Sequence, residues 1–155
     1  LREELYPILK KIAEYNGALG TGHITKQEAL AVVKEAAKSG VKKIVVTHPL
    51  ATFVNYSLDD MKEALNHGAM FIEHCFNDVT RQVAFPITQK TISDAIRAIG
   101  AKYTIMSTDS GQWLNPVPVQ QMGIYIKDML DLGISDEDVR MMVSTNPARM
   151  LGLEI

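Results

Sequence analysis

The sequence has little of what marks several classes of protein. It contains one cysteine, Cys75, so no disulfide can form within the chain, which fits a reducing cytoplasm. No apolar run approaches the roughly 20 residues of a membrane-spanning helix, and no signal-peptide pattern stands at the start. The 16 basic residues are scattered and nearly balance the 18 acidic ones, leaving a net charge of −2. We therefore expect a cytoplasmic protein that binds neither membranes nor nucleic acid.

Length and composition predict one globular domain. The chain has 155 residues, of which 46% are hydrophobic and 22% charged, as in ordinary soluble proteins. Neither a low-complexity segment nor a flexible linker interrupts it, so we expect residues 1–155 to form a single domain. Because the chain begins with Leu1 instead of Met, we also expect a fragment of a longer protein or a processed piece.

A unit of apolar strand, polar turn and amphipathic helix recurs four times along the chain. The β-branched run Ile44-Val45-Val46 suits a strand covered on both faces, as in a parallel sheet. Thr25 and Glu28 have the spacing of a capping box, which starts a helix. The predicted strands are residues 17–21, 43–47, 69–73 and 103–106, with a helix over 1–15 and short helices after Ser135 and Asn146. This alternation predicts an α/β fold, either an open doubly wound sheet or a (βα)4 half of a barrel.

An ionisable residue follows each predicted strand. His23, His48, His74 and Asp109 are separated by 25, 26 and 35 residues, each close to one strand–helix repeat. The carboxyl ends of parallel strands share one edge, where α/β proteins bind their ligands, so we expect these side chains to converge. Imidazole and carboxylate bind zinc and related ions and also transfer protons. The pattern predicts a metal site or an acid–base site.

Each of these residues also has a purely structural interpretation. His48 could hydrogen-bond the loop before Pro49, His23 could cap its own loop, and Asp109 could only form a turn. We favour function for these three because they coincide with strand ends. His74 has acidic Glu73 and apolar neighbours, and it is nearly as well explained as a core histidine. We exclude His67, which lies at a helix C-terminus and complements the helix dipole.

Nucleophilic catalysis has weaker support in the sequence. Ser107 and Ser110 lack the G-x-S-x-G pattern of a nucleophile elbow. Cys75 stands next to His74, but adjacent residues of a strand point to opposite faces, so they do not form a catalytic pair.

Five segments together resemble the C-terminal half of an amidohydrolase-superfamily barrel, a family of metal-dependent hydrolases. They are GTGHITKQEAL, KKIVVTHP, FIEHCFN, IMSTDSGQ and STNPARMLGL, and they are most similar to a group of uncharacterised amidohydrolase-like proteins. The resemblance implies a (βα)8 barrel whose strands five to eight are present here. It also implies a divalent metal ion, zinc first, with manganese or iron as alternatives.

Carried over residue by residue, the resemblance gives His23 and His48 as metal ligands and Asp109 as a ligand that also moves protons. His48 is then catalytic together with Asp109, while His74 and Ser110 contact substrate. The register stays open, because IEHCFN also resembles the HCF segment on strand six of related deoxyribonuclease-like hydrolases. In that register His74 replaces His23 as a ligand.

The sequence departs from the family where the H-x-H pair of strand one and the lysine or glutamate of strand four are expected. A barrel of this type needs roughly 250 residues, so we expect self-association or pairing with a missing N-terminal half. The implied activity is hydrolysis of an amide, ester or lactone bond in a small molecule by metal-activated water, with Asp109 as general base and acid. Alternatives are a non-catalytic half-barrel that only folds and oligomerises, a decarboxylase or a phosphoesterase.

Overall fold

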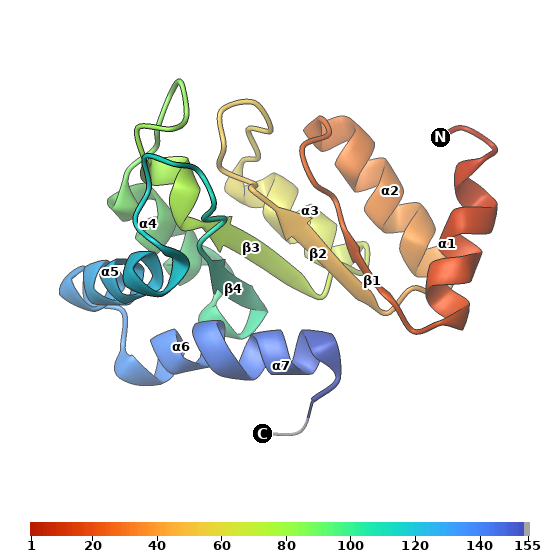
Figure 1. The fold of residues 1–155 in the computed structure, drawn as a ribbon. Helices are drawn as coiled ribbons and strands as arrows, with labels where there is room; N and C mark the ends of the chain where they lie inside the picture. Colours follow the sequence, from red (N-terminus) through yellow and green to blue (C-terminus); the bar gives the residue numbers. More distant parts are fainter. Residues whose placement is uncertain (154–155) are drawn as a thin grey trace.

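A four-stranded, all-parallel sheet organises the chain in a computed structural model that describes residues 1–153 (Figure 1). Its strands are β1 (Ala18–Gly20), β2 (Lys43–Thr47), β3 (Phe71–Cys75) and β4 (Thr104–Ser107). They lie side by side in the order of the sequence, β1-β2-β3-β4, and each neighbouring pair is parallel. The predicted α/β fold is confirmed. The described strands lack the reversal of order at which doubly wound sheets bind ligands.

A helix follows each strand, and the first three of these helices return the chain to the start of the next strand. These helices are α2 (Lys26–Lys38), α3 (Leu58–Asn66), α4 (Gln89–Ile99) and α5 (Pro118–Asp131). The predicted capping box of α2 is confirmed, because Thr25 Oγ1 accepts from Glu28 N and Glu28 Oε2 accepts from Thr25 N. Ser57 and Asp60 form a second capping box at α3. Residues 1–153 contain no helix with the length and apolarity needed to cross a membrane.

The remaining elements lie at the two ends of the described chain and in its turns. Helix α1 precedes β1, and α6, η3 and α7 follow α5; η1 and η2 are short turns on either side of α4. Their bounds are α1 (Leu5–Glu14), η1 (Phe76–Val79), η2 (Ala101–Tyr103), α6 (Asp136–Arg140), η3 (Met141–Thr145) and α7 (Asn146–Leu151). The predicted terminal helices are present, and α1 accommodates Pro7 in its first turn, where a missing amide hydrogen costs no helical bond.

Alternation of side chains along the strands gives the sheet two different faces. Ile44, Val46 and Ile72 are fully buried on the face covered by α2 and α3. Phe71 and Ile105 lie on the opposite face, where they pack against Met150 of α7. The helix-covered face therefore carries most of the core, and the opposite face has a smaller apolar cluster.

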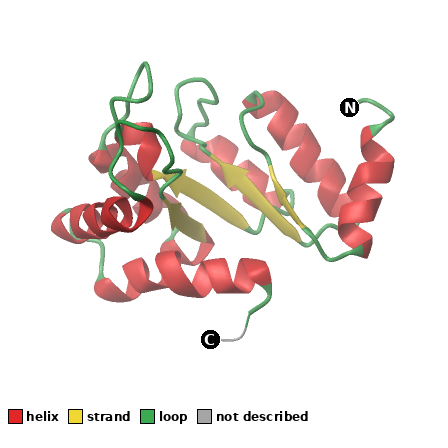
Figure 2. Cartoon of the chain, in the orientation of Figure 1, coloured by secondary structure: helices red, strands yellow, loops and turns green. Residues whose placement is uncertain are grey.

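The strands point toward one edge of the sheet, and long loops gather there. Figure 2 shows these loops in green beyond the arrowheads of β2 and β3. One loop leads from β2 to α3, a second from η1 to α4, and a third from β4 to α5. Residues at the ends of β2, β3 and β4 are thereby brought to a common place.

The predicted bounds of three strands are wrong, and one of these errors matters for the site. β4 spans Thr104–Ser107 instead of residues 103–106. The third strand, predicted to end at Glu73, extends to Cys75, so His74 lies inside the strand instead of after it. β1 is shorter than predicted, and His23 lies three positions beyond its last residue, Gly20. The predicted end of β2 is confirmed, with His48 directly after Thr47.

Candidate functional site

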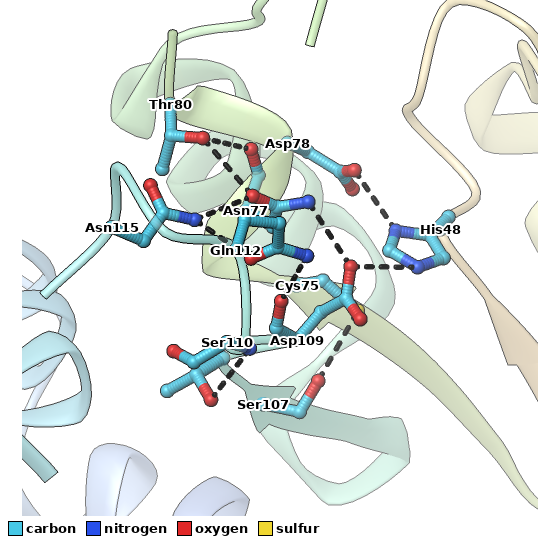
Figure 3. A network of polar contacts seen from close by, with 11 residues as sticks. His48, Cys75, Asn77, Asp78, Thr80, Ser107, Asp109, Ser110, Gln112 and Asn115 are labelled. Carbon is cyan, nitrogen blue, oxygen red and sulfur yellow. Dashed lines mark hydrogen bonds and ion pairs between the residues drawn. The ribbon is translucent and has the colours of Figure 1, made fainter. Parts of the chain in front are cut away.

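His48 is held at the end of β2 by a buried carboxylate from the next strand's loop. Its side chain is buried, and Nδ1 lies 2.9 Å from Oδ1 of Asp78 (Figure 3). Asp78 belongs to η1, directly beyond β3, and is itself only 4% exposed. The backbone amide of His48 also donates to the carbonyl of Glu73 at 3.2 Å. The imidazole is therefore fixed in place by both its backbone and its ring.

Asp109 approaches the same imidazole from the loop after β4. Its Oδ2 lies 3.7 Å from His48 Nε2 and accepts a hydrogen bond from Asn77 Nδ2 at 3.1 Å. Its backbone carbonyl accepts from Gln112 Nε2 at 2.9 Å. The Asp109 side chain is 42% exposed, so this carboxylate is open to solvent while Asp78 is not. The predicted convergence of His48 and Asp109 is therefore present in the structure.

Both residues adopt a backbone conformation that favours glycine. Within the described chain, four non-glycine residues have positive φ, of which two are asparagines, the side chain that best tolerates it. The other two are His48, with φ of 53°, and Asp109, with φ of 49°. Glycine would adopt this conformation without strain, and strained residues cluster at functional sites. The backbone at these two positions thus favours a role for their side chains.

A cavity of about 280 Å³ opens between these residues. His23, Phe53 and Val83 complete its lining with His48, Asn77, Asp78 and Asp109. The ring centroids of His23 and His48 are 4.9 Å apart, and Phe53 meets His23 edge-on at 5.2 Å. His23 is exposed. The three predicted metal ligands therefore share one cavity, although a larger hollow of about 880 Å³ lies elsewhere, between α1 and α2.

The charges around His48 decide its protonation. Burial of the ring lowers its pKa, but the hydrogen bond and charge of Asp78, with the charges of Asp109 and Glu73, outweigh burial and raise the pKa above its usual value. When the ring is neutral, the carboxylate of Asp78 selects the tautomer with hydrogen on Nδ1. Nε2 then presents its lone pair to the cavity and to Asp109.

His74 is not brought into this cavity. It lies on the helix-covered face of β3, 1% exposed, and burial lowers its pKa to about 4. Its Nε2 has no hydrogen-bond partner among the described residues, and its backbone carbonyl accepts from Tyr125 Oη at 3.3 Å. The structure thus gives His74 the position of a core histidine, neutral at physiological pH.

The three other side chains considered at these strand ends, Ser107, Ser110 and Cys75, also lie outside the cavity lining. Ser110 Oγ is buried without a partner in the described chain. Cys75 Sγ lies 3.2 Å from Ser107 Oγ, and burial raises the pKa of the thiol far above its usual value. A buried thiol that stays protonated is a poor nucleophile, which agrees with the expectation that Cys75 and His74 form no catalytic pair.

Sequence reasoning missed Asn77 and Asp78, although a signal for them existed. Both lie within three residues of the end of the third strand, so the rule that identified His48 applies to them as well. The predicted strand ended two residues too early, and the first ionisable residue after it, His74, took their place. Phe53 had no comparable signal, because it lies in the middle of the loop between β2 and α3.

The donor types at the site fit a divalent cation, but the set is small. His48 Nε2 and Asp109 Oδ2 face each other across the cavity, and Asp78 orients the imidazole as outer-shell carboxylates do for metal-bound histidines. Within residues 1–153, no three His, Cys, Asp or Glu side chains have the geometry of a metal centre. His48 and Asp109 therefore offer two donors of suitable type, and the described residues place no third donor with them in the geometry of a metal centre.

A family model matches the N-terminal part of the chain. The model of a family of unknown function, DUF6282, matches residues 1–73. The matched part contains His23 and His48 and ends before Asn77, Asp78 and Asp109. No curated protein matches the chain.

Proposed function

We propose that this chain carries the catalytic edge of a metal-dependent hydrolase of the amidohydrolase type. Its substrate is a small molecule with an amide, ester or lactone bond, and Asp109 is the general base and acid. One observation carries the proposal: a buried Asp78 aims Nε2 of His48 at the carboxylate of Asp109 across a cavity. The left-handed backbone of His48 and Asp109 adds support.

The residues of this chain divide the work of hydrolysis. Asp109 is open to solvent, so its carboxylate can accept a proton from a water molecule and later give it to the leaving group. Asn77 donates to Asp109 Oδ2 and holds the carboxylate in place. Asp78 fixes the ring of His48 so that Nε2 faces the reacting water or carbonyl. A divalent ion, zinc or else manganese or iron, would be held by His48 and Asp109 and would lower the pKa of that water. His23, the third predicted ligand, would have to move to complete the set, because the three side chains do not have the geometry of a metal centre.

The sheet supports the barrel part of the proposal. Its strands follow the order of the sequence, and the site lies at their carboxyl ends, where (βα)8 barrels have their active sites. We infer that β1 to β4 correspond to strands five to eight of such a barrel. Within the described sheet, β1 and β4 are the two edges, and Ala18 and Gly20 of β1 are exposed. An open edge favours pairing, so we propose self-association or pairing with a complementary half.

A second candidate is a non-catalytic half-barrel that only folds and oligomerises. The specific observation in its favour is the shortage of donors, because residues 1–153 contain no group of three. This candidate predicts association without saturable metal binding. Two measurements distinguish this candidate from the hydrolase: sedimentation of the chain with and without metal, which reports association, and the metal content of the purified chain.

The decisive experiment combines metal titration with assays on simple esters, anilides and lactones. We expect the wild-type chain to bind about one equivalent of Zn²⁺, Mn²⁺ or Co²⁺, and His48→Gln and Asp109→Asn to weaken that binding. Asp109→Asn is expected to slow hydrolysis about 100-fold or more, as loss of a general base does. The matched control is His67→Gln, on the surface next to Glu63, which should change neither property. Unchanged turnover in Asp109→Asn would remove this residue from the mechanism, and absence of saturable binding would favour the non-catalytic candidate.

A further inference from the structure

A second cavity lies beside the candidate active site. It has a volume of about 530 Å³ and lies between residues 79–82, which follow β3, and residues 114–116, which follow β4. Phe76, Val79, Leu114 and Pro116 give it apolar walls, and Arg81 and Gln82 add polar groups. The cavity is therefore lined by apolar side chains together with a few polar ones, of which Arg81 is charged.

The polar groups that are left without partners there are hydrogen-bond donors. Arg81 forms no ion pair with any residue in the described part of the chain. Gln82 Nε2 is buried and has no hydrogen-bond partner among those residues. An unpaired buried donor is costly, and no carboxylate lines this cavity. The cavity therefore suits a ligand that brings acceptor oxygens and a negative charge.

The side chain of Asn77 lines the candidate active site and is hydrogen-bonded to residues of this second cavity. Asn77 Oδ1 accepts from Thr80 Oγ1 at 3.0 Å and from Asn115 Nδ2 at 2.9 Å, and both donors line the second cavity. Asn77 Nδ2 donates in the other direction, to Asp109 Oδ2. In Figure 3, Thr80 and Asn115 lie on one side of Asn77, and His48 lies on the other. A small molecule could therefore contact both cavities across Asn77.

We propose that the second cavity binds the carboxylate of an organic acid with an apolar body, through Arg81 and Gln82. The planar guanidinium matches the two oxygens of a carboxylate, and the apolar walls accept the hydrocarbon part. Asp78 and Asp109 stand across Asn77 and would repel a phosphate dianion more than a monoanion. The bound acid is one end of the substrate whose other end reaches Asp109. This last statement rests on the proposed function, whereas binding of the acid does not.

The binding test compares an acid with its neutral amide. The probes are 4-phenylbutyrate, 4-phenylbutyramide and inorganic phosphate, titrated into the ¹⁵N-labelled full chain and followed through the amide and side-chain resonances of Arg81 and Gln82. We expect the acid to bind at least about tenfold more tightly than the amide, a factor that corresponds to about 1.4 kcal/mol, and more tightly than phosphate. Arg81→Gln should remove this preference, and Arg81→Lys should restore part of it. Arg140→Gln, an exposed arginine of α6, is the matched control and should change nothing.

Several results would overturn the assignment. They are equal affinity for acid and amide, tighter binding of phosphate than of the acid, and an acid preference that survives Arg81→Gln. A kinetic test separates this proposal from the hydrolase itself. Acid preference without any hydrolysis would support the cavity and count against the hydrolase. If esters are hydrolysed but the wild-type chain has the same KM for carboxylate-bearing and neutral esters, or a lower KM for the carboxylate-bearing ester survives Arg81→Gln, the hydrolase stands and the substrate assignment fails.

Discussion

Replacing Asp78 with asparagine is the sharpest test of how the site is held together. The two side chains have nearly the same shape, so Asp78→Asn removes the charge beside His48 and leaves the packing in place. Asp78 Oδ1 lies 2.9 Å from His48 Nδ1, and both residues are 4% exposed. An effect on His48 would therefore come from the lost carboxylate and not from a cavity.

The size of the effect follows from the kind of hydrogen bond that is changed. A buried hydrogen bond to a charged group contributes about 1.5–3 kcal/mol to stability and a neutral one about 0.5–1.5 kcal/mol. We therefore expect Asp78→Asn to lower the free energy of unfolding by about 1–2 kcal/mol. For a domain of this size, about 2–4 °C is lost per kcal/mol, so the midpoint of thermal unfolding should fall by about 2–8 °C.

The effect should depend on pH in a definite direction. The folded-state pKa of His48 is raised above the usual value of 6.5, so the stability from its charged form is fully present below that value. This stability is lost as the pH rises through the folded-state pKa. The difference in stability between wild type and Asp78→Asn should therefore be larger at about pH 6 than at about pH 9.

Urea unfolding at the two pH values, with ¹⁵N spectra of the imidazole, provides the measurement. The spectra should show hydrogen on Nδ1 in the neutral wild-type ring and a lower pKa of His48 in the variant. Asp94→Asn is the control, because Asp94 lies on the surface with a half-exposed side chain, and such changes stay within about 0.5 kcal/mol. The same loss of stability at both pH values, or an unchanged pKa of His48, would refute the Asp78–His48 pairing.

Two further predictions concern the scaffold. Burial lowers the pKa of His74 to about 4 in the folded chain, whereas the pKa of an unfolded histidine is about 6.5. Below about pH 6.5 the unfolded chain therefore binds a proton that the folded chain lacks. The free energy of unfolding should fall as the pH drops from about 6.5 toward 4. His74→Leu should remove up to about 3 kcal/mol of this loss. The measurement is urea unfolding of wild type and His74→Leu at about pH 4 and pH 7. The same pH dependence of stability in wild type and variant would contradict the prediction. Gly68→Ala would place a Cβ 2.7 Å from Ala37 Cβ at a φ of 114°, whereas Gly100→Ala, at a φ of 96°, meets nothing within 4 Å. Both variants strain the backbone, but only at Gly68 does the new Cβ also overlap another side chain, that of Ala37. Gly68→Ala should therefore be less stable than Gly100→Ala by about 1–3 kcal/mol. Equal stabilities of the two variants would contradict the close contact between residue 68 and Ala37.

The sequence was sufficient for the architecture because the relevant signals are local. Alternating strands and helices, the β-branched run in β2 and the capping pair Thr25 and Glu28 each depend on neighbours within a few residues. The convergence of His48 and Asp109 followed from one further rule, that parallel strands end at a common edge. The position of these two residues could therefore be predicted without knowledge of their contacts.

His74 shows where such reasoning fails. Extending the strand by two residues placed His74 inside it, and strand alternation turned its side chain toward the helices. Cys75 and Phe76 continue the apolar pattern beyond His74, so no local signal marked the end of this strand. The same error hid Asn77 and Asp78, which lie in the turn that follows. An error of two residues in the end of the third strand therefore led to the choice of His74, a core histidine, in place of Asn77 and Asp78, which contact Asp109 and His48.

The contacts that hold the two strained residues come from the chain around the end of β3. Glu73 accepts the backbone amide of His48, Asp78 accepts from its ring, and Asn77 donates to the carboxylate of Asp109. These contacts join residues 25 to 32 positions apart, so they exist only once β3 lies between β2 and β4. The left-handed backbone at His48 and Asp109 is thus stabilised by tertiary structure, which is why local sequence could suggest the two residues but not their conformation. It follows that the site and the central strand form together, and loss of β3 packing would release both turns.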